Sequence, residues 1–240
     1  MGKFTKWIAG GLGWAFLGPI GGIMGFVLGS IVDEAQQGQK TSGYSMTTTG
    51  SFVTSMLVLV AAVMKADEKL MRSELNYVKD YFVRNFGEES AEEAIHMLRD
   101  ILKQNIPVRE VTEQIRRNLD YSSRLQLLHF LFGVANADGR IHEKEREVIE
   151  RIASGMGISD KDIQSIKSMF IEDTDYAYRI LEVDPEATDQ QVKKAYRQMA
   201  NKYHPDKVSH LGEDFQQVAN QKFQKVNEAY EKIRKERNMN

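Results

Sequence analysis

Residues 176–206, YAYRILEVDPEATDQQVKKAYRQMANKYHPD, decide how the C-terminal part of the chain folds. The apolar residues at the start of this stretch predict a short helix over Tyr176–Leu181. Pro185 follows its end, because the residue before a proline disfavours helical backbone. A second helix begins after Thr188, a residue type that caps helix N-termini well. The stretch closes on His204-Pro205-Asp206, which we expect to form an exposed loop.

The second helix has one apolar face and one basic face. At about 100° per residue, a narrow apolar stripe is formed by Val192, Tyr196, Met199 and Tyr203. The opposite side carries Lys193, Lys194 and Arg197. A third helix is predicted over Asp214–Glu236. Its apolar residues face the same core and are Ala219, Phe223, Val226, Tyr230 and Ile233. We therefore predict an antiparallel helical hairpin whose loop carries His204-Pro205-Asp206.

The order of these features resembles the J-domain of DnaJ-type (Hsp40) co-chaperones. The resemblance covers residues 175–235, including KKAYRQMA, HPDK and KFQKVNEAYEKI, and we assign residues 172–240 to this domain. It implies that an Hsp70 of the DnaK type is engaged by His204, Pro205 and Asp206. It also implies that an acidic surface of that partner is held by Lys193, Lys194, Arg197 and Lys202. Such a protein stimulates ATP hydrolysis by its partner and is not itself an enzyme.

Composition narrows the function further. The chain has 240 residues, 28% of them charged, a formal net charge of −2 and no cysteine. No global basic field points to nucleic acid as a partner. The lack of cysteine excludes disulfides, thiolate metal sites and cysteine nucleophiles. No zinc-protease, nucleotide-loop or nucleophile motif is present, so we expect neither catalysis nor a cofactor. Only four prolines interrupt long helical patterns, which predicts an all-α fold.

The N-terminal segment is strongly apolar. No charged residue occurs from Trp7 to Val32, a run long enough for a helix to cross a hydrocarbon core of about 30 Å. We predict a membrane anchor over residues 1–35 that contacts lipid through residues 7–32. Glycines spaced four apart, as in Gly18-xxx-Gly22, favour close helix contact and a homodimer. A membrane hairpin bent at Gly18-Pro19 and a buried soluble hairpin are the alternatives.

The charges around this segment give conflicting signals about its orientation. Lys3 and Lys6 precede it while Asp33 and Glu34 follow it, so the positive-inside rule alone would export the rest of the chain. A J-domain outside the cell would meet no ATP-driven Hsp70. We therefore predict a bacterial inner-membrane protein with residues 33–240 in the cytoplasm.

The middle of the chain reads as a helical domain. A polar linker is predicted over residues 36–45 and the domain over residues 46–171. Phe52–Met64 is strongly apolar but too short to span a membrane, which favours a central buried helix. Further helices are predicted over residues 72–86, 90–103, 108–118, 122–137, 143–155 and 160–171.

An internal repeat lies within this domain. Residues 66–70, ADEKL, are followed by Glu74, and residues 137–141, ADGRI, by Glu145. The repeat resembles the tellurite-resistance TerB-like domain, an all-helical module with an A-D-G-x-[IL] turn in each half. The first copy departs from that motif at Glu68.

The repeat also raises the question of a cation site. Aligned as an EF-hand with Gly139 at the sixth loop position, the second copy places Asn136, Asp138, Ile141 and Glu145 where ligands would be needed. The candidate acidic ligands of the two copies are Asp67, Glu74, Asp138 and Glu145. The first loop position, which needs an acid, is Val63 or Val134. We therefore expect no metal site. Instead, the aspartates organise the turns by Asx-type hydrogen bonds, and the glutamates favour the helix starts.

A glycine-rich anchor, a TerB-like domain and a terminal J-domain together resemble the DjlA type of membrane-anchored bacterial co-chaperone. The chain lacks the Gly/Phe-rich linker and zinc repeats of DnaJ. The alternative is a membrane-associated adaptor or stress sensor whose TerB-like domain binds the main partner or a cation.

Overall fold

The structure is a computed structural model that describes residues 18–21, 23, 48–66, 71–171 and 175–239. Within these residues the secondary structure is helical and contains no strand, as the all-α prediction requires. The longer helices are α3 Thr48–Met64, α4 Arg72–Phe86, α5 Glu88–Leu102, α6 Val108–Asn118, α7 Tyr121–Ala135, α8 Glu143–Gly155 and α9 Asp160–Lys167. The C-terminal part contains α10 Tyr176–Ile180, α11 Asp189–Lys202, the 3₁₀ segment η1 Pro205–Leu211 and α12 Glu213–Glu236.

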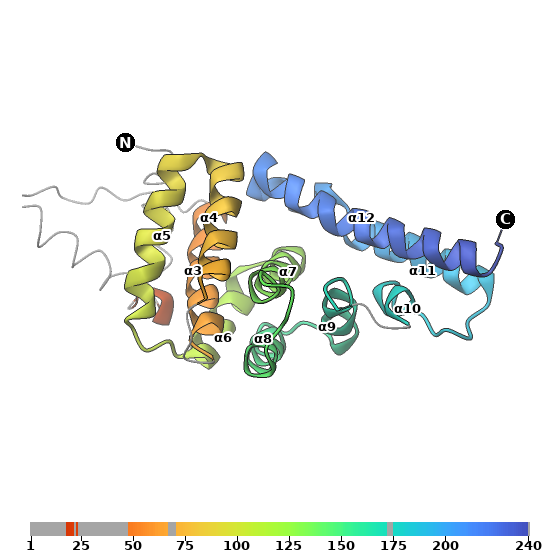
Figure 1. Cartoon of the computed structure of the whole chain (residues 1–240), viewed down its shortest axis with the longest axis horizontal. Helices are drawn as coiled ribbons and strands as arrows, with labels where there is room; N and C mark the ends of the chain where they lie inside the picture. The colour runs from red at the N-terminus through yellow and green to blue at the C-terminus, as the bar shows by residue number, and fades with distance from the viewer. Residues whose placement is uncertain (1–17, 22, 24–47, 67–70, 172–174, 240) are drawn as a thin grey trace, which may run out of the picture.

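The centre of the middle domain is formed by α3 and α7. Every residue from Phe52 to Met64 is buried, which confirms the prediction of a central helix. In α7 the residues from Leu125 to Ala135 are likewise buried. Neither helix has a polar face, since each is surrounded by other helices. Helix α5 packs against both α3 and α4, and α8 and α9 pack against α7 (Figure 1).

Several helix bounds differ from the prediction, among them those of α5, α7 and α9. Helix α5 begins two residues earlier than predicted, directly after Gly87, whose φ is 85°. Helix α7 begins at Tyr121 because Asp120 caps it, accepting a hydrogen bond from the Ser123 N–H at 2.9 Å. Helix α9 ends at Lys167, and the following turn brings the Phe170 ring within 4.8 Å of the His129 ring.

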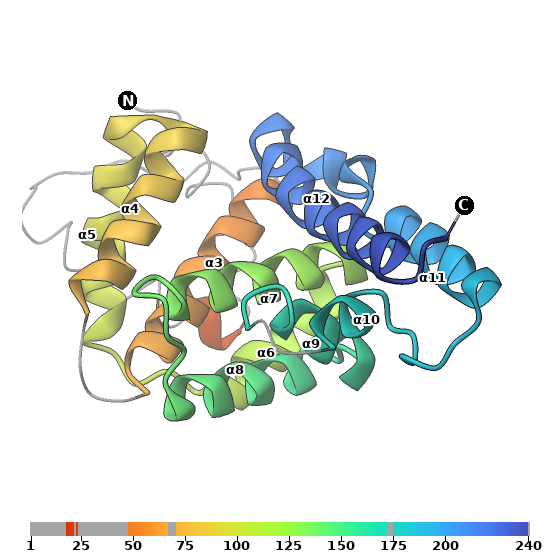
Figure 2. The same cartoon turned by 45° about the vertical axis from the view of Figure 1, so that its right-hand side comes forward.

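The J-like region forms the predicted hairpin. Helices α11 and α12 lie side by side in both views (Figures 1 and 2), and the Tyr196 and Tyr230 rings stack at 4.3 Å. Thr188 and Gln191 form the capping box that starts α11. The predicted core position Phe223 is only half-buried, whereas its neighbour Lys222 is fully buried. The α12 stripe is thus rotated slightly, because α12 also packs against the middle domain.

Only a small part of the predicted membrane segment is described. Ile20 and Ile23 are buried against the helical domain, and the Ile20 N–H donates to Gln114 Oε1 at 3.2 Å. The rest of residues 7–32 and the linker 36–45 lie outside the described residues. Among the helices that the structure describes, none combines the length and the apolar character needed to cross a membrane.

Candidate functional site

The tripeptide His204-Pro205-Asp206 lies at the bend of the α11–α12 hairpin. The Asp206 side chain is 81% exposed, and that of His204 is 49% exposed. The Asp206 N–H donates to His204 Nδ1 at 3.3 Å, so the histidine caps the start of η1. The His204 ring also meets the Phe223 ring edge-on at 5.8 Å. The Asp206 carboxylate, whose Oδ2 lies 3.5 Å from His204 Nδ1, stays exposed at the loop tip, where it can face a partner.

The basic residues predicted beside the tripeptide lie along α11. Lys194 and Arg197 are exposed, and neither forms an ion pair within the described part of the chain. Lys193, one turn before Arg197, is partly exposed. Behind them, Val192 and Met199 are buried against α12, and the Tyr196 hydroxyl donates to Asn227 Oδ1 at 3.0 Å. The helix therefore presents one basic face to solvent, and we call Lys193, Lys194 and Arg197 the basic ridge.

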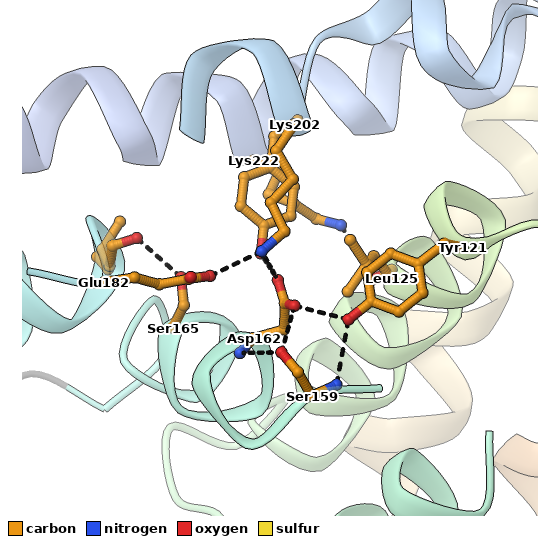
Figure 3. Close-up of polar contacts among 10 residues, drawn as sticks. Tyr121, Leu125, Ser159, Asp162, Ser165, Glu182, Lys202 and Lys222 are labelled. Carbon is orange, nitrogen blue, oxygen red and sulfur yellow. Dashed lines mark hydrogen bonds and ion pairs between the residues drawn. The ribbon is translucent and has the colours of Figure 1, made fainter. Parts of the chain in front are cut away.

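Lys202 is placed differently from the rest of the predicted basic set. Its ammonium group forms ion pairs with Asp162 of α9 and, at 2.9 Å, with Glu182 (Figure 3). Glu182 follows α10 and has a φ of 54°, a left-handed conformation that ends that helix. Lys202 thus joins the J-like region to the middle domain, although it lies only two residues before the tripeptide.

Asp162 is the centre of this junction. It is 2% exposed and accepts hydrogen bonds from the hydroxyls of Tyr121 and Ser159, each at 2.6 Å. Tyr203 directly precedes the tripeptide, and its hydroxyl donates a hydrogen bond to the other carboxylate oxygen of Asp162 at 3.2 Å. Burial alone would raise the pKa of the Asp162 carboxyl. The hydrogen bonds from Lys202, Ser159 and Tyr121 outweigh burial and lower the pKa.

A second lysine is buried in the same junction. Lys222 of α12 is 1% exposed, and its Nζ donates to the Leu125 carbonyl of α7 at 3.0 Å (Figure 3). Its ammonium group lies 5.0 Å from the centre of the Tyr203 ring. Burial lowers the pKa of Lys222 from 10.5 to about 7. The negative charge of Asp162 acts in the opposite direction and raises the pKa, but burial has the larger effect.

A third contact holds the segment after the tripeptide. His210 Nε2 lies 2.8 Å from Asp120 Oδ2, at the start of α7. Burial would raise the pKa of Asp120, but hydrogen bonds from Ser123 and the neighbouring His210 lower it. The junction therefore contacts the chain on both sides of His204-Pro205-Asp206.

The cation-ligand candidates have structural roles where they are described. Asp138 Oδ1 accepts a hydrogen bond from the Arg140 N–H at 2.9 Å, the Asx-type contact that was expected. Glu74 accepts from the Met71 N–H at 3.0 Å, and Glu145 from the His142 N–H at 3.1 Å. Asp67 lies outside the described residues. The described residues contain no cluster of three or more acidic or histidine side chains suited to a metal ion.

The sequence did not point to Asp162, Glu182 or Lys222. Each lies in an ordinary amphipathic pattern, and their meeting depends on how two domains dock. The available signal for Lys222 was its place beside the apolar stripe of α12, next to Phe223. For Asp162 the visible signal was only its place in the first turn of a helix capped by Ser159.

Three known family models match successive parts of the chain. Residues 1–42 match the co-chaperone DjlA transmembrane domain. Residues 54–168 match tellurite resistance protein TerB, and residues 176–239 match the DnaJ domain. No solved structure matches the chain.

Curated relatives are similar over nearly the whole length. The co-chaperone protein DjlA of Coxiella burnetii is 25% identical over 260 residues, covering 95% of this chain and 96% of that protein. DjlA of Photobacterium profundum is 26% identical, covering 94% of this chain and 95% of that protein. DjlA of Vibrio cholerae is 28% identical, covering 78% of each. With its three domain matches in the DjlA order, the chain belongs to the DjlA type of J-domain co-chaperones.

Proposed function

We propose that this protein recruits a DnaK-type Hsp70 to a membrane and stimulates its ATP hydrolysis through His204-Pro205-Asp206. The observation that carries the proposal is the exposed Asp206 carboxylate at the hairpin bend, beside the basic ridge. The DnaJ-domain match over residues 176–239 supports the same class of partner.

The geometry suits docking onto a charged protein surface. An exposed carboxylate at a loop tip forms a strong, charge-assisted hydrogen bond with a partner arginine. Pro205 limits the conformational entropy that the loop loses on binding. The basic ridge attracts an acidic surface and raises the association rate, an effect that falls as salt increases.

The protein needs no catalytic group for this role. A partner with several conformations shifts toward the one that the co-chaperone binds best. If docking favours the conformation of Hsp70 that hydrolyses ATP, the rate rises while the chemistry stays in the partner. In this proposal the tripeptide provides the specific contact with Hsp70, and the basic ridge attracts the partner before that contact forms.

The experiment is a steady-state ATPase assay of a DnaK-type Hsp70 titrated with the full chain in detergent or liposomes. We expect wild-type protein to stimulate hydrolysis and Asp206→Asn, which keeps the shape but loses the charge, to give no stimulation. Asp160→Asn, an exposed substitution on α9, serves as the charge-matched control. Equal stimulation by Asp206→Asn and wild type would remove the role proposed for the tripeptide.

We also propose that the TerB-like and J-domains face the cytoplasm of a bacterial inner membrane. The match of residues 1–42 to a transmembrane domain supports the anchor, and the need for ATP-driven Hsp70 supports the orientation. Lipid contact through residues 7–32 and self-association through their glycines stay predictions.

Protease added to membrane vesicles of known orientation tests this topology. Inside-out vesicles expose the cytoplasmic face, so residues 48–239 should be digested there and protected in right-side-out vesicles. The opposite pattern would place the J-domain outside the cell and contradict the proposal.

A further inference from the structure

The segment that carries the tripeptide is held by the TerB-like domain on both of its sides. Before it, Tyr203 donates to Asp162, and Lys202 forms an ion pair with the same carboxylate. After it, His210 contacts Asp120. The chain between these anchors is short, so the tripeptide is exposed but stays next to α7 and α9.

Little space separates this segment from α7. The crevice between them has a volume of about 10 Å³, close to the minimum for one water molecule. Its lining includes Leu125 and Gln126 of α7 together with Tyr203, His204 and Lys222. A partner side chain therefore cannot enter beside His204 on this side unless the two domains separate.

The junction also engages the positive charge of Lys202, which a partner would otherwise meet. The J-domain resemblance counts Lys202 among the residues that meet an acidic surface of Hsp70, but here its ammonium group lies between Asp162 and Glu182. A partner carboxylate would have to compete with Asp162, which is already buried and accepts three hydroxyl hydrogen bonds.

We propose that the TerB-like domain restrains the J-domain through the Asp162–Lys202 contact, and that productive docking of Hsp70 requires this contact to open. The proposal rests on the proposed function, since it concerns access to the same site. Asp162 is in this view a regulatory residue that competes with Hsp70 for Lys202.

The composition of the junction suits a contact that opens. Its central groups are charged, and buried charges lose hydration that their ion pairs only partly restore. Lys222, fully buried against the Leu125 carbonyl and the face of the Tyr203 ring, adds to the cost of the closed arrangement. Domain contacts that are polar and modest in size commonly permit relative motion.

A reversible cross-link tests the need for opening. The chain has no cysteine, so the double variant Asp120→Cys/His210→Cys carries a unique thiol pair across the junction. A short, cleavable bismaleimide would hold the full chain closed, and the same variant with both thiols capped by N-ethylmaleimide is the control. We expect the cross-link to reduce Hsp70 ATPase stimulation at least about five-fold, the factor that corresponds to about 1 kcal/mol, and cleavage to restore it.

Substitution of Asp162 tests the residue itself. In the full chain, Asp162→Asn should lower the concentration that gives half-maximal stimulation, while Asp160→Asn should leave it unchanged. Full stimulation by the cross-linked protein would overturn the requirement for opening. Identical behaviour of the Asp162→Asn and Asp160→Asn variants would overturn the role of Asp162. Absence of stimulation by every form, the wild-type and uncross-linked proteins included, would contradict the proposed function itself.

Discussion

Lys222 shows at the scale of one residue how the two domains constrain each other. In an isolated hairpin its side chain would sit at the border of the α12 core stripe, in water. Here it is fully buried against α7, and its pKa is lowered to about 7. At pH values between about 7 and 10.5, Lys222 is protonated in the unfolded chain and has lost its proton in the folded chain. The contribution of Lys222 to stability therefore increases as pH rises through this range.

We predict that Lys222→Met stabilises the protein at pH 7, by about 1–3 kcal/mol, because it removes a buried amine of similar length. The variant should also lose the part of the pH dependence between pH 7 and 10 that belongs to Lys222. Calorimetry of the full chain at several pH values measures both effects. Lys225→Met, at a side chain that is 45% exposed, is the matched control. An unchanged pH slope in Lys222→Met would show that the lysine titrates normally.

The sequence predicted individual residues well where their chemistry is local. The exposed tripeptide, the basic ridge and the Thr188–Gln191 capping box each depend on neighbours within one or two helical turns. The Asp162–Lys202 contact joins residues that no local pattern connects. The J-domain resemblance grouped Lys202 with the ridge, although its ammonium group is engaged by Asp162 and Glu182.

At the scale of elements, the two acidic helix starts explain the internal repeat. Glu74 and Glu145 are both buried, and each carboxylate accepts the backbone N–H three residues earlier. Each also lies in the first turn, where the helix dipole favours negative charge. The repeated motif thus describes a way to start a helix after a tight turn.

Removal of this cap should weaken α8. We expect Glu145→Ala to lower the free energy of unfolding by about 1 kcal/mol, because the His142 N–H loses its partner. Glu147→Ala, on an exposed face of the same helix, should have little effect. Thermal unfolding in Ca²⁺ and in EDTA completes the test, with equal transition temperatures expected. Stabilisation by Ca²⁺ that disappears in Glu145→Ala would instead reveal a cation site.

Helix existence was predictable, and helix ends were less so. Periodicity identifies α4, α6 and α8 with their observed bounds. The end of α9 depends on Phe170 reaching His129 and Phe132, which are distant in sequence. The rotation of α12 away from its expected core stripe likewise follows from contact with another domain.

At the scale of the whole molecule, a J-domain is docked against a TerB-like domain whose N-terminal neighbour matches a membrane anchor. The order of domains could be read from the sequence because each has its own pattern. Their docking could not, because it depends on a few charged residues that would be equally suited to a solvated surface. In the arrangement that we propose, Hsp70 reaches the tripeptide productively only when the domain junction is open.

The central claim is that His204-Pro205-Asp206 acts on Hsp70, and the rate of ATP hydrolysis by a DnaK-type Hsp70 tests it most directly. With increasing amounts of the full chain, the account predicts a saturable increase for wild type and Asp160→Asn, and none for Asp206→Asn. An equal increase with Asp206→Asn, or no increase with wild type, would contradict it.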